Sequence, residues 1–212
     1  MSKDRRSRQT VFVVEDDEPM RDALALALGK AGYACETFPD ATGFLNAFTR
    51  WPADRSGCLV LDIFLPDISG LDLQDRLSAT ADGLPIIFIT GRGDIPMAVR
   101  AMKGGAVDVL PKPFKAEDLL ERTAAALCAD AKRRRIRRAR KELRDRLVRL
   151  TPREKQVFER IAGGQANKAV AIDFGISERT VEIHRSRVMK KMQARNLADL
   201  VRMKFCLEGR QN

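Results

Sequence analysis

The 212-residue sequence lacks paired cysteines. Its four cysteines, Cys35, Cys58, Cys128 and Cys206, lie far apart, and none belongs to a CxxC pair. This spacing argues against a thiol-based metal or redox centre and indicates buried free thiols in a reducing cytoplasm.

Long apolar runs and histidines are also scarce. No run approaches the ~20 apolar residues that a membrane-spanning helix needs, and the polar, basic N-terminus leads directly into a strand-like segment. We therefore expect a cytoplasmic protein with no signal peptide and no membrane partner. The single histidine, His184, is interpreted as a partly buried structural side chain rather than a ligand or a pH switch.

The charge that is present divides the chain into two halves. Residues 1–127 hold 15 Lys and Arg against 19 Asp and Glu, whereas residues 128–212 hold 24 against 10. The overall net charge of +10 thus conceals a mildly acidic half and a strongly basic one. This asymmetry predicts two modest domains, the second of which binds a polyanion.

The first half alternates short apolar runs with helical patterns. The expected strands are 10–14, 33–38, 58–62, 85–90 and 106–110, and the expected helices are 18–31, 41–50, 70–79, 94–104 and 115–129. Such alternation predicts βαβ units, and hence a five-stranded parallel sheet with helices on both faces. The unbroken apolar run Cys58–Leu61, which ends in Asp62, indicates a strand that is buried on both faces.

Polar residues follow the successive strands of this predicted sheet. They are Asp16 and Asp17 after the first strand, Asp62 at the end of the third, Thr90 at the end of the fourth and Lys112 after the fifth. In a parallel sheet these positions share one edge. Crowded carboxylates favour a divalent cation, and oxygen ligands favour Mg²⁺. Singly, each Asp could be a turn former and Lys112 a surface residue, but together they favour phosphoryl transfer onto Asp62, with Lys112 offsetting charge and Thr90 donating its hydroxyl.

Residues 130–149 link the halves and contain eleven basic residues between Lys132 and Arg149. There is no Gly or Pro, and Ile136, Leu143 and Leu150 recur every seven residues. This pattern predicts a helix with a narrow apolar stripe. Its charge is open to three interpretations: a solvated face, a phosphate contact or a partner helix.

From Thr151 onward the patterns are purely helical. Helices are expected over 152–162, 166–174, 178–192 and 196–207, with Gly175 and Ser177 at the turn between the second and third. This arrangement predicts a helix-turn-helix. In the third helix, Val181, Val188 and Met192 share one face for burial, and the opposite face is suited to base edges and phosphates. That outward face holds Arg179, Ile183, Ser186 and Lys190, flanked by Glu182 and Arg187.

Four segments of the first half together resemble the receiver domain of two-component response regulators. They are EDD at 15–17, DIFLPDISG at 62–70, TGRGDIPMAVRAMKGGAVD at 90–108 and KPF at 112–114. The resemblance implies a flavodoxin-like fold with strand order 2-1-3-4-5 and phosphorylation of Asp62 by a sensor histidine kinase. It also implies Mg²⁺ held by Asp17, Asp62 and the backbone carbonyl of Phe64, with Asp16 acting partly through water, and a cis Lys112–Pro113 bond. Val109 departs from the family, which usually places an aromatic switch residue or histidine there.

Residues 150–203 resemble the LuxR-type helix-turn-helix, and the two domains together resemble the NarL/FixJ family, especially its FixJ-like branch. The resemblance implies a last helix that dimerises on DNA, so that a C2 dimer would read half-sites about 10 base pairs apart, or a multiple of that. It places Glu182, Ile183 and Ser186 at base-reading positions. It makes candidates for phosphate contacts of Lys168, Arg179, Thr180, Arg185, Arg187 and Lys190.

The resulting hypothesis is a DNA-binding transcriptional response regulator that is not an enzyme. We expect a receiver domain over 1–128, a helical basic linker over 129–149 and the DNA-binding domain over 150–212. The expected partners are a sensor histidine kinase, double-stranded DNA, RNA polymerase and, on phosphorylation, a second copy. The alternatives are an RNA-binding regulator, a receiver that no kinase uses, and a metal-dependent phosphohydrolase, although such enzymes carry a second Asp where this chain has Phe64.

Overall fold

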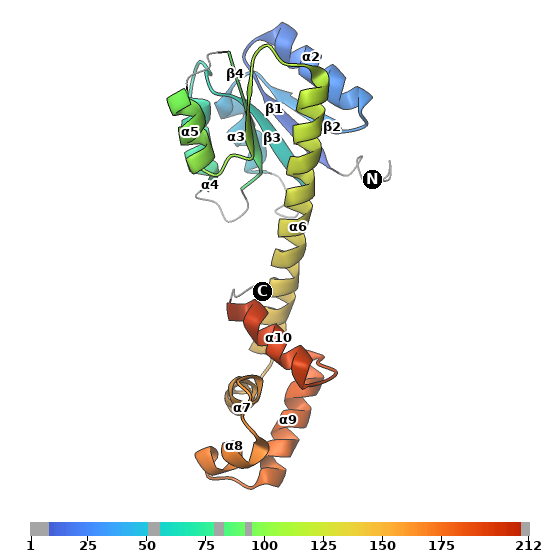
Figure 1. Cartoon of the computed structure of the whole chain (residues 1–212), viewed down its shortest axis with the longest axis vertical. Coiled ribbons are helices and arrows are strands. Elements are labelled where there is room, and N and C mark those ends of the chain that lie inside the picture. The colour runs from blue at the N-terminus through green and yellow to red at the C-terminus, as the bar shows by residue number, and fades with distance from the viewer. Residues whose placement is uncertain (1–8, 51–55, 79–82, 92–94, 209–212) are drawn as a thin grey trace. The chain divides into compact units, whose positions relative to one another are not determined.

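The computed structural model describes residues 9–50, 56–78, 83–91 and 95–208. The chain divides into two compact units, Met1–Arg134 and Arg135–Asn212, which are drawn in Figure 1. Residues 79 and 94, which were expected to be helical, lie outside the described residues, as does the basic N-terminal segment 1–8.

The first unit is built on the predicted parallel sheet. Its strands are β1 (Thr10–Val14), β2 (Ala34–Phe38), β3 (Gly57–Asp62), β4 (Ile86–Thr90) and β5 (Asp108–Pro111). All neighbours pair in parallel, in the order β2-β1-β3-β4-β5, which confirms the predicted topology. The three central strands are buried or nearly so along their length, because apolar residues face helices on both sides.

Helices cover both faces of this sheet (Figure 1). They are α2 (Glu18–Lys30), α3 (Ala41–Phe48), α4 (Gly70–Ser78), α5 (Ile95–Lys103) and the N-terminal part of α6 (Ala116–Val148). One core cluster joins Phe12 and Phe88 of the sheet to Phe44 of α3 and to residues of α4 and α5. A second joins Val13 and Ile87 to residues of α2 and α6. The two clusters are the two faces of one doubly covered sheet.

Helix α6 is longer than the sequence pattern suggested. The helix expected over 115–129 and the helical linker expected after it form one helix, Ala116–Val148, which passes through the unit boundary between Arg134 and Arg135. Its N-terminal part buries Leu119, Ala126 and Leu127 in the core of the first unit. Because no Gly or Pro interrupts the following residues, nothing in the backbone chemistry ends the helix there.

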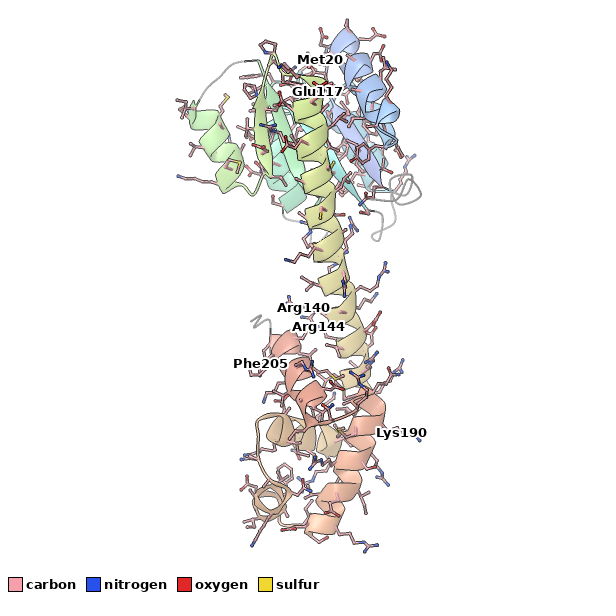
Figure 2. The ribbon with its side chains drawn as sticks, turned by 45° about the vertical axis from the view of Figure 1, so that its right-hand side comes forward. Met20, Glu117, Arg140, Arg144, Lys190 and Phe205 are labelled. Carbon is pink, nitrogen blue, oxygen red and sulfur yellow. The ribbon has the colours of Figure 1, made fainter. Side chains whose placement is uncertain are left out.

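The second unit contains α7 (Pro152–Ala162), α8 (Asn167–Phe174), α9 (Glu178–Met192) and α10 (Leu197–Glu208). Side chains cap two of these helices: Thr151 and Glu154 form a capping box at the start of α7, and Ser177 accepts a hydrogen bond from the backbone N–H of Thr180 at the start of α9. Gly175 ends α8 with φ +63°, a conformation that favours glycine. Figure 2 labels Lys190 on α9 and Phe205 on α10.

The four cysteines are free, as expected, but only Cys58 is fully buried. Cys35 and Cys206 are half-buried, and Cys128 is exposed on α6. Burial raises the pKa of the Cys35 thiol to about 11. Among the described residues, no helix combines the length and apolar character needed to cross a membrane.

Candidate functional site

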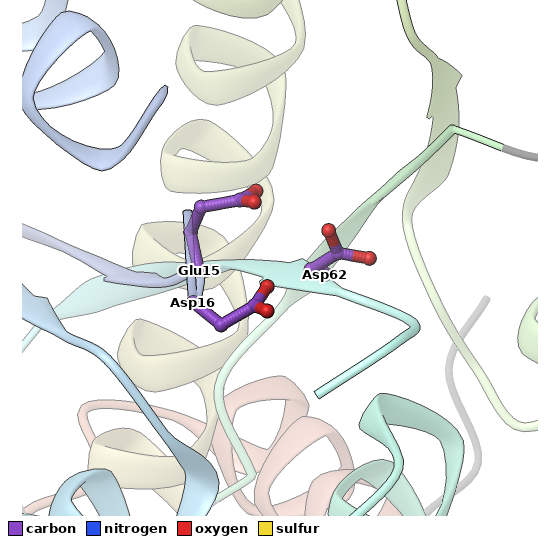
Figure 3. A group of neighbouring side chains, drawn as sticks. All are labelled: Glu15, Asp16 and Asp62. Atoms are coloured by element: carbon purple, nitrogen blue, oxygen red, sulfur yellow. The ribbon is translucent and has the colours of Figure 1, made fainter. Parts of the chain in front are cut away.

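Three carboxylates meet at the carboxyl edge of the sheet. β1 ends at Val14, so Glu15 and Asp16 leave the sheet beside Asp62, the last residue of β3. Oxygen atoms of Glu15, Asp16 and Asp62 lie within 4.8 Å of one another. Figure 3 shows the three side chains at this edge. Glu15 and Asp62 are buried and Asp16 is exposed. The group can therefore be approached from solvent on the side of Asp16.

Lys112 connects two of these carboxylates. Its Nζ lies 2.7 Å from Asp62 Oδ2 and 2.8 and 2.9 Å from the two oxygens of Glu15. The residue is positioned by its backbone N–H, which donates to the Thr90 carbonyl at 2.7 Å, and it precedes the expected cis bond to Pro113. Thr90 itself is buried at the end of β4, one residue beyond the position that pairs with Asp62.

Burial and charge act in opposite directions on these groups. Burial disfavours the charged form of Lys112, but hydrogen bonds to Asp62 and Glu15 outweigh it and raise the lysine pKa. Burial, together with repulsion from Asp62, raises the pKa of Glu15, although the hydrogen bond from Lys112 works against the increase. The site thus holds an excess of negative charge that one ammonium group only partly offsets.

The loop after β3 folds back against Asp62. The backbone N–H of Phe64 donates to Asp62 Oδ1 at 2.9 Å, and that of Gly70 donates to the Ile63 carbonyl at 2.9 Å. A Cβ atom on Gly70 would lie 2.2 Å from the Asp62 carbonyl oxygen. Only glycine therefore allows this close approach.

Asp67 anchors the far end of the same loop to α3. Its carboxylate accepts hydrogen bonds from Thr42 Oγ1 at 2.6 Å and from the backbone N–H groups of Thr42 and Ala41 at 2.9 and 3.2 Å. Burial opposes ionisation, but these bonds outweigh it and lower the pKa of Asp67 to about 2. The loop that carries Phe64 is therefore held at both ends.

The structure brings together most of the predicted acid-pocket residues. Asp16, Asp62 and Lys112 lie at the site, Thr90 lies at the adjacent strand end, and Phe64 contacts Asp62 through its backbone N–H. Asp17 is placed differently, since its Oδ1 accepts a hydrogen bond from the Met20 backbone N–H at 2.8 Å and caps α2.

Glu15 occupies the place that the sequence pattern assigned to Asp17. Four consecutive acidic residues, 15–18, follow β1, and the pattern did not show which of them face the pocket. The signal that could have identified Glu15 is Pro19, because proline is common in the first turn of a helix and places Asp17 near its N-cap.

The carboxylate cluster fits a hard divalent cation. Oxygen ligands from one or two carboxylates are what Mg²⁺ takes from proteins, and three carboxylates here present oxygens within one small volume. At the usual switch position, Val109 pairs with Phe88 and packs against the core cluster of Phe12. An aliphatic side chain therefore fills that position.

In the second unit, α9 buries the predicted face and exposes the predicted outer one. Val181, Val188 and Met192 are fully buried. Ile183 is 47% exposed, so it lies on the outer face of α9 as predicted. The other exposed candidates for DNA contact are Lys168, Arg179, Glu182, Ser186, Arg187 and Lys190.

Two predicted contacts already have partners inside the unit. Thr180 Oγ1 lies 2.8 Å from Ser177 Oγ within the cap of α9, and Arg185 Nη1 donates to Asn167 Oδ1 at 3.1 Å. Both side chains are half-buried, as is His184. Arg185 therefore joins α9 to the start of α8.

Family models match both units of the chain. The response regulator receiver domain matches residues 11–124, and the luxR family of bacterial regulatory proteins matches residues 148–204.

Relatives match over nearly the whole chain. Nodulation protein W of Bradyrhizobium diazoefficiens is 48% identical over 93% of this chain and 86% of its own length. Transcriptional regulatory protein FixJ of Azorhizobium caulinodans is 44% identical over 91% of this chain and 90% of its own length. The solved structure of response regulator StyR matches with a TM-score of 0.82 and 44% identity over 93% of this chain and 98% of that one. The chain therefore belongs to the response regulators that combine a receiver domain with a LuxR-type DNA-binding domain, and FixJ and nodulation protein W are among its relatives.

Proposed function

We propose that this chain is a transcription regulator switched by Mg²⁺-dependent phosphorylation of Asp62 by a sensor histidine kinase. The observation that carries the proposal is the ammonium group of Lys112, which bridges Asp62 and Glu15 beside Asp16 on a chain that also carries a LuxR-type unit. Such a site has an acceptor, a positive charge and a set of oxygen ligands within a few ångströms.

The chemistry begins with a carboxylate oxygen of Asp62, which attacks the phosphorus of a phosphohistidine. The P–O bond forms as the P–N bond breaks, and the electron pair returns to the imidazole of the kinase, which takes up a proton. Lys112, 2.7 Å from Asp62, compensates charge on the transferred group, and the Thr90 hydroxyl is available at the neighbouring strand end.

The proposed ligands of Mg²⁺ are the carboxylates of Glu15, Asp16 and Asp62, with the backbone carbonyl of Phe64. Asp17, which was also predicted, would have to leave its capping position on α2 to join them. When bound, the cation supplies positive charge that stabilises the phosphoryl group in transfer.

Phosphorylation is proposed to pair two receivers through α5, β5 and the first turns of α6. This face of the first unit exposes Ile95, Val99 and Met102, which are 75%, 45% and 49% exposed. In the second unit, α10 exposes Leu197 and Phe205 and is the proposed dimerisation helix. The homodimer would then read two half-sites of promoter DNA.

On the DNA, Glu182, Ile183 and Ser186 are the proposed base-reading residues. The regulator would act on RNA polymerase in the cytoplasm and would have no enzymatic turnover of its own. The proposed phosphate contacts are Lys168, Arg179, Thr180, Arg185, Arg187 and Lys190.

Selection of bound duplexes from a random DNA pool, with and without acetyl phosphate and Mg²⁺, tests the proposal. Acetyl phosphate should enrich one duplex sequence, raise its affinity and shift the wild-type chain toward a dimer in gel filtration. Asp62→Ala should abolish all three responses, whereas Asp75→Ala, which removes an exposed carboxylate of α4, should keep them. Equal DNA binding and equal size for wild type and Asp62→Ala under both conditions would refute the proposed switch.

A further inference from the structure

Helix α6 carries a one-sided group of cations after the unit boundary. Arg138, Lys141 and Arg144 follow one another at intervals of three residues, and Arg140 lies four residues before Arg144. Side chains three and four residues apart lie on the same face of a helix. These four residues are called the basic stripe, and Figure 2 labels two of them, Arg140 and Arg144.

The opposite face of α6 is turned toward α10 of the second unit. A pocket there is lined by Ala139, Glu142, Leu143 and Arg146 of α6 together with residues of α10. At about 100° per residue, this lining is centred roughly 180° from the centre of the basic stripe. The basic stripe therefore points away from α10, and three of its members, all but the half-buried Arg140, are exposed.

Within the described part of the chain, the cations of the basic stripe form no salt bridge, unlike some other cations of the second unit. Lys191 pairs with Glu154, Lys204 with Glu159, and Arg202 with Asp199. Over the described residues 138–145, by contrast, no salt bridge forms, although Glu142 and Asp145 are nearby in sequence. Like charges at these spacings repel one another along a helix. Glu142 and Asp145, four residues after Arg138 and Lys141, offset only part of this charge, so the basic stripe keeps a net positive charge.

The end of α6 is attached to α9. Arg146 Nη1 donates to the Met192 carbonyl, the last residue of α9, at 3.3 Å. Leu147 and Leu150 pack in the core cluster that contains Val188 and Met192. The basic stripe and the helix with the predicted base contacts thus belong to one compact unit.

We propose that the basic stripe binds the phosphate backbone of duplex DNA beside the bases that α9 reads, and so adds affinity that does not depend on sequence. This inference rests on the proposed DNA binding by α9. Guanidinium groups match phosphate geometry, and a duplex held by α9 brings a dense array of phosphates to this unit. A polyanion is the partner that such a row of cations fits, which favours the phosphate-contact interpretation of the charge of residues 130–149.

The salt dependence of DNA binding tests the proposal on the full chain. The variant is Arg138→Gln with Lys141→Gln and Arg144→Gln, and the probes are the duplex selected as described above and a random duplex of equal length. Affinity for both should fall by the same factor, about tenfold or more at 0.1 M salt, because each lost phosphate contact reduces the slope of log K against log salt by about 0.9. The slope should therefore become shallower by about 2 to 3.

The matched control removes three exposed cations of the first unit that lie outside α5, β5 and α6, by Lys30→Gln with Arg50→Gln and Arg76→Gln. It loses the same charge and should keep the wild-type slope. A basic-stripe variant with an unchanged slope, or one that loses affinity for the selected duplex alone, overturns the inference. If the wild-type chain binds neither duplex, the proposed function fails instead, and circular dichroism melting of each variant excludes a failure to fold.

Discussion

At the scale of single residues, the acid pocket depends on one cation. Lys112 Nζ contacts both buried carboxylates, Glu15 and Asp62, and its side chain is 23% exposed. Removing a partner from a buried ion pair leaves the remaining charge uncompensated, which costs more than the pair itself contributes. Glu15 would then favour its protonated form.

Lys112→Met should lower the free energy of unfolding of the receiver by about 2 kcal/mol at pH 8. The loss should shrink at pH 5.5. Burial already raises the pKa of Glu15, and removal of the ammonium would raise it further. A group with a raised folded-state pKa favours folding below its unfolded pKa, and this contribution disappears as the pH rises through the folded-state value.

Urea unfolding of the full chain at the two pH values measures this effect. Lys115→Met removes an exposed lysine three residues away and should leave stability within about 0.5 kcal/mol of the wild type. A Lys112→Met loss that is equal at both pH values would show that the protonation of Glu15 does not respond to the ammonium.

The same pocket shows how far residue-level prediction reaches. Asp62 and Lys112 could be assigned because each is the one ionisable residue at its strand end. The strand pattern alone did not separate Glu15 from Asp17, although the end of β1 was predicted correctly, because it does not show which carboxylate of the acidic run turns toward the site. The position of Pro19, which places Asp17 at the N-cap of α2, carried that information.

At the scale of elements, α7 and α9 are joined by a buried carboxylate. Glu154 accepts a hydrogen bond from the Thr151 backbone N–H at 2.8 Å and one from Lys191 Nζ at 2.6 Å, and its side chain is 3% exposed. Burial opposes ionisation, but these bonds outweigh it and lower the pKa of Glu154. One residue thus caps α7 and contacts α9.

Glu154→Gln should destabilise the second unit by about 1 kcal/mol at pH 7. A lowered folded-state pKa gives stability that is present above the ordinary carboxyl value of 4.5 and is lost as the pH falls through the folded-state value. The difference between wild type and variant should therefore be constant above about pH 6 and shrink below pH 4.5.

Thermal unfolding of the two proteins between pH 3 and 7 checks this dependence. Asp173→Asn breaks a more exposed pair with Arg160 and should change stability by less than about 0.5 kcal/mol at any of these pH values. A Glu154→Gln difference that persists unchanged at pH 3 would contradict the assignment.

Elements were easier to predict than side-chain positions. All five strands were placed to within two residues, because apolar runs and breakers mark them directly. The merging of two expected helices into α6 was not predicted. The apolar residues of α6 belong to the first unit up to Arg134 and to the second unit after it, while the backbone remains helical throughout. The spacing of apolar residues predicts which face of a helix is buried, but it does not predict which domain core that face packs against.

At the scale of the whole molecule, each unit has its own core. The clusters around Phe12 and Val13 lie in Met1–Arg134, and those around Phe158 and Val170 lie in Arg135–Asn212. Within the first unit, Asp130 of α6 is fully buried and faces the start of β3. Its carboxylate accepts from Arg134 Nε at 2.7 Å, Arg133 Nη2 at 2.9 Å, Ser56 Oγ at 3.0 Å and the Gly57 backbone N–H at 3.4 Å. Asp130 therefore attaches α6, near the end of the first unit, to the start of β3. Asp62 is the last residue of the same strand.

Asp130→Ala should lower the stability of the first unit by about 3 kcal/mol, because four donors lose a buried charged acceptor. Asp130→Asn keeps an acceptor oxygen and should lose less, while Glu121→Ala, at an exposed position of α6, should lose almost nothing. Hydrogen exchange followed by mass spectrometry reads the units separately: amides of β3 and β4 should exchange faster in Asp130→Ala, and amides of α9 should keep the wild-type rate. Equal acceleration in α9 would mean that the two cores unfold as one and that α6 transmits stability as well as chain continuity.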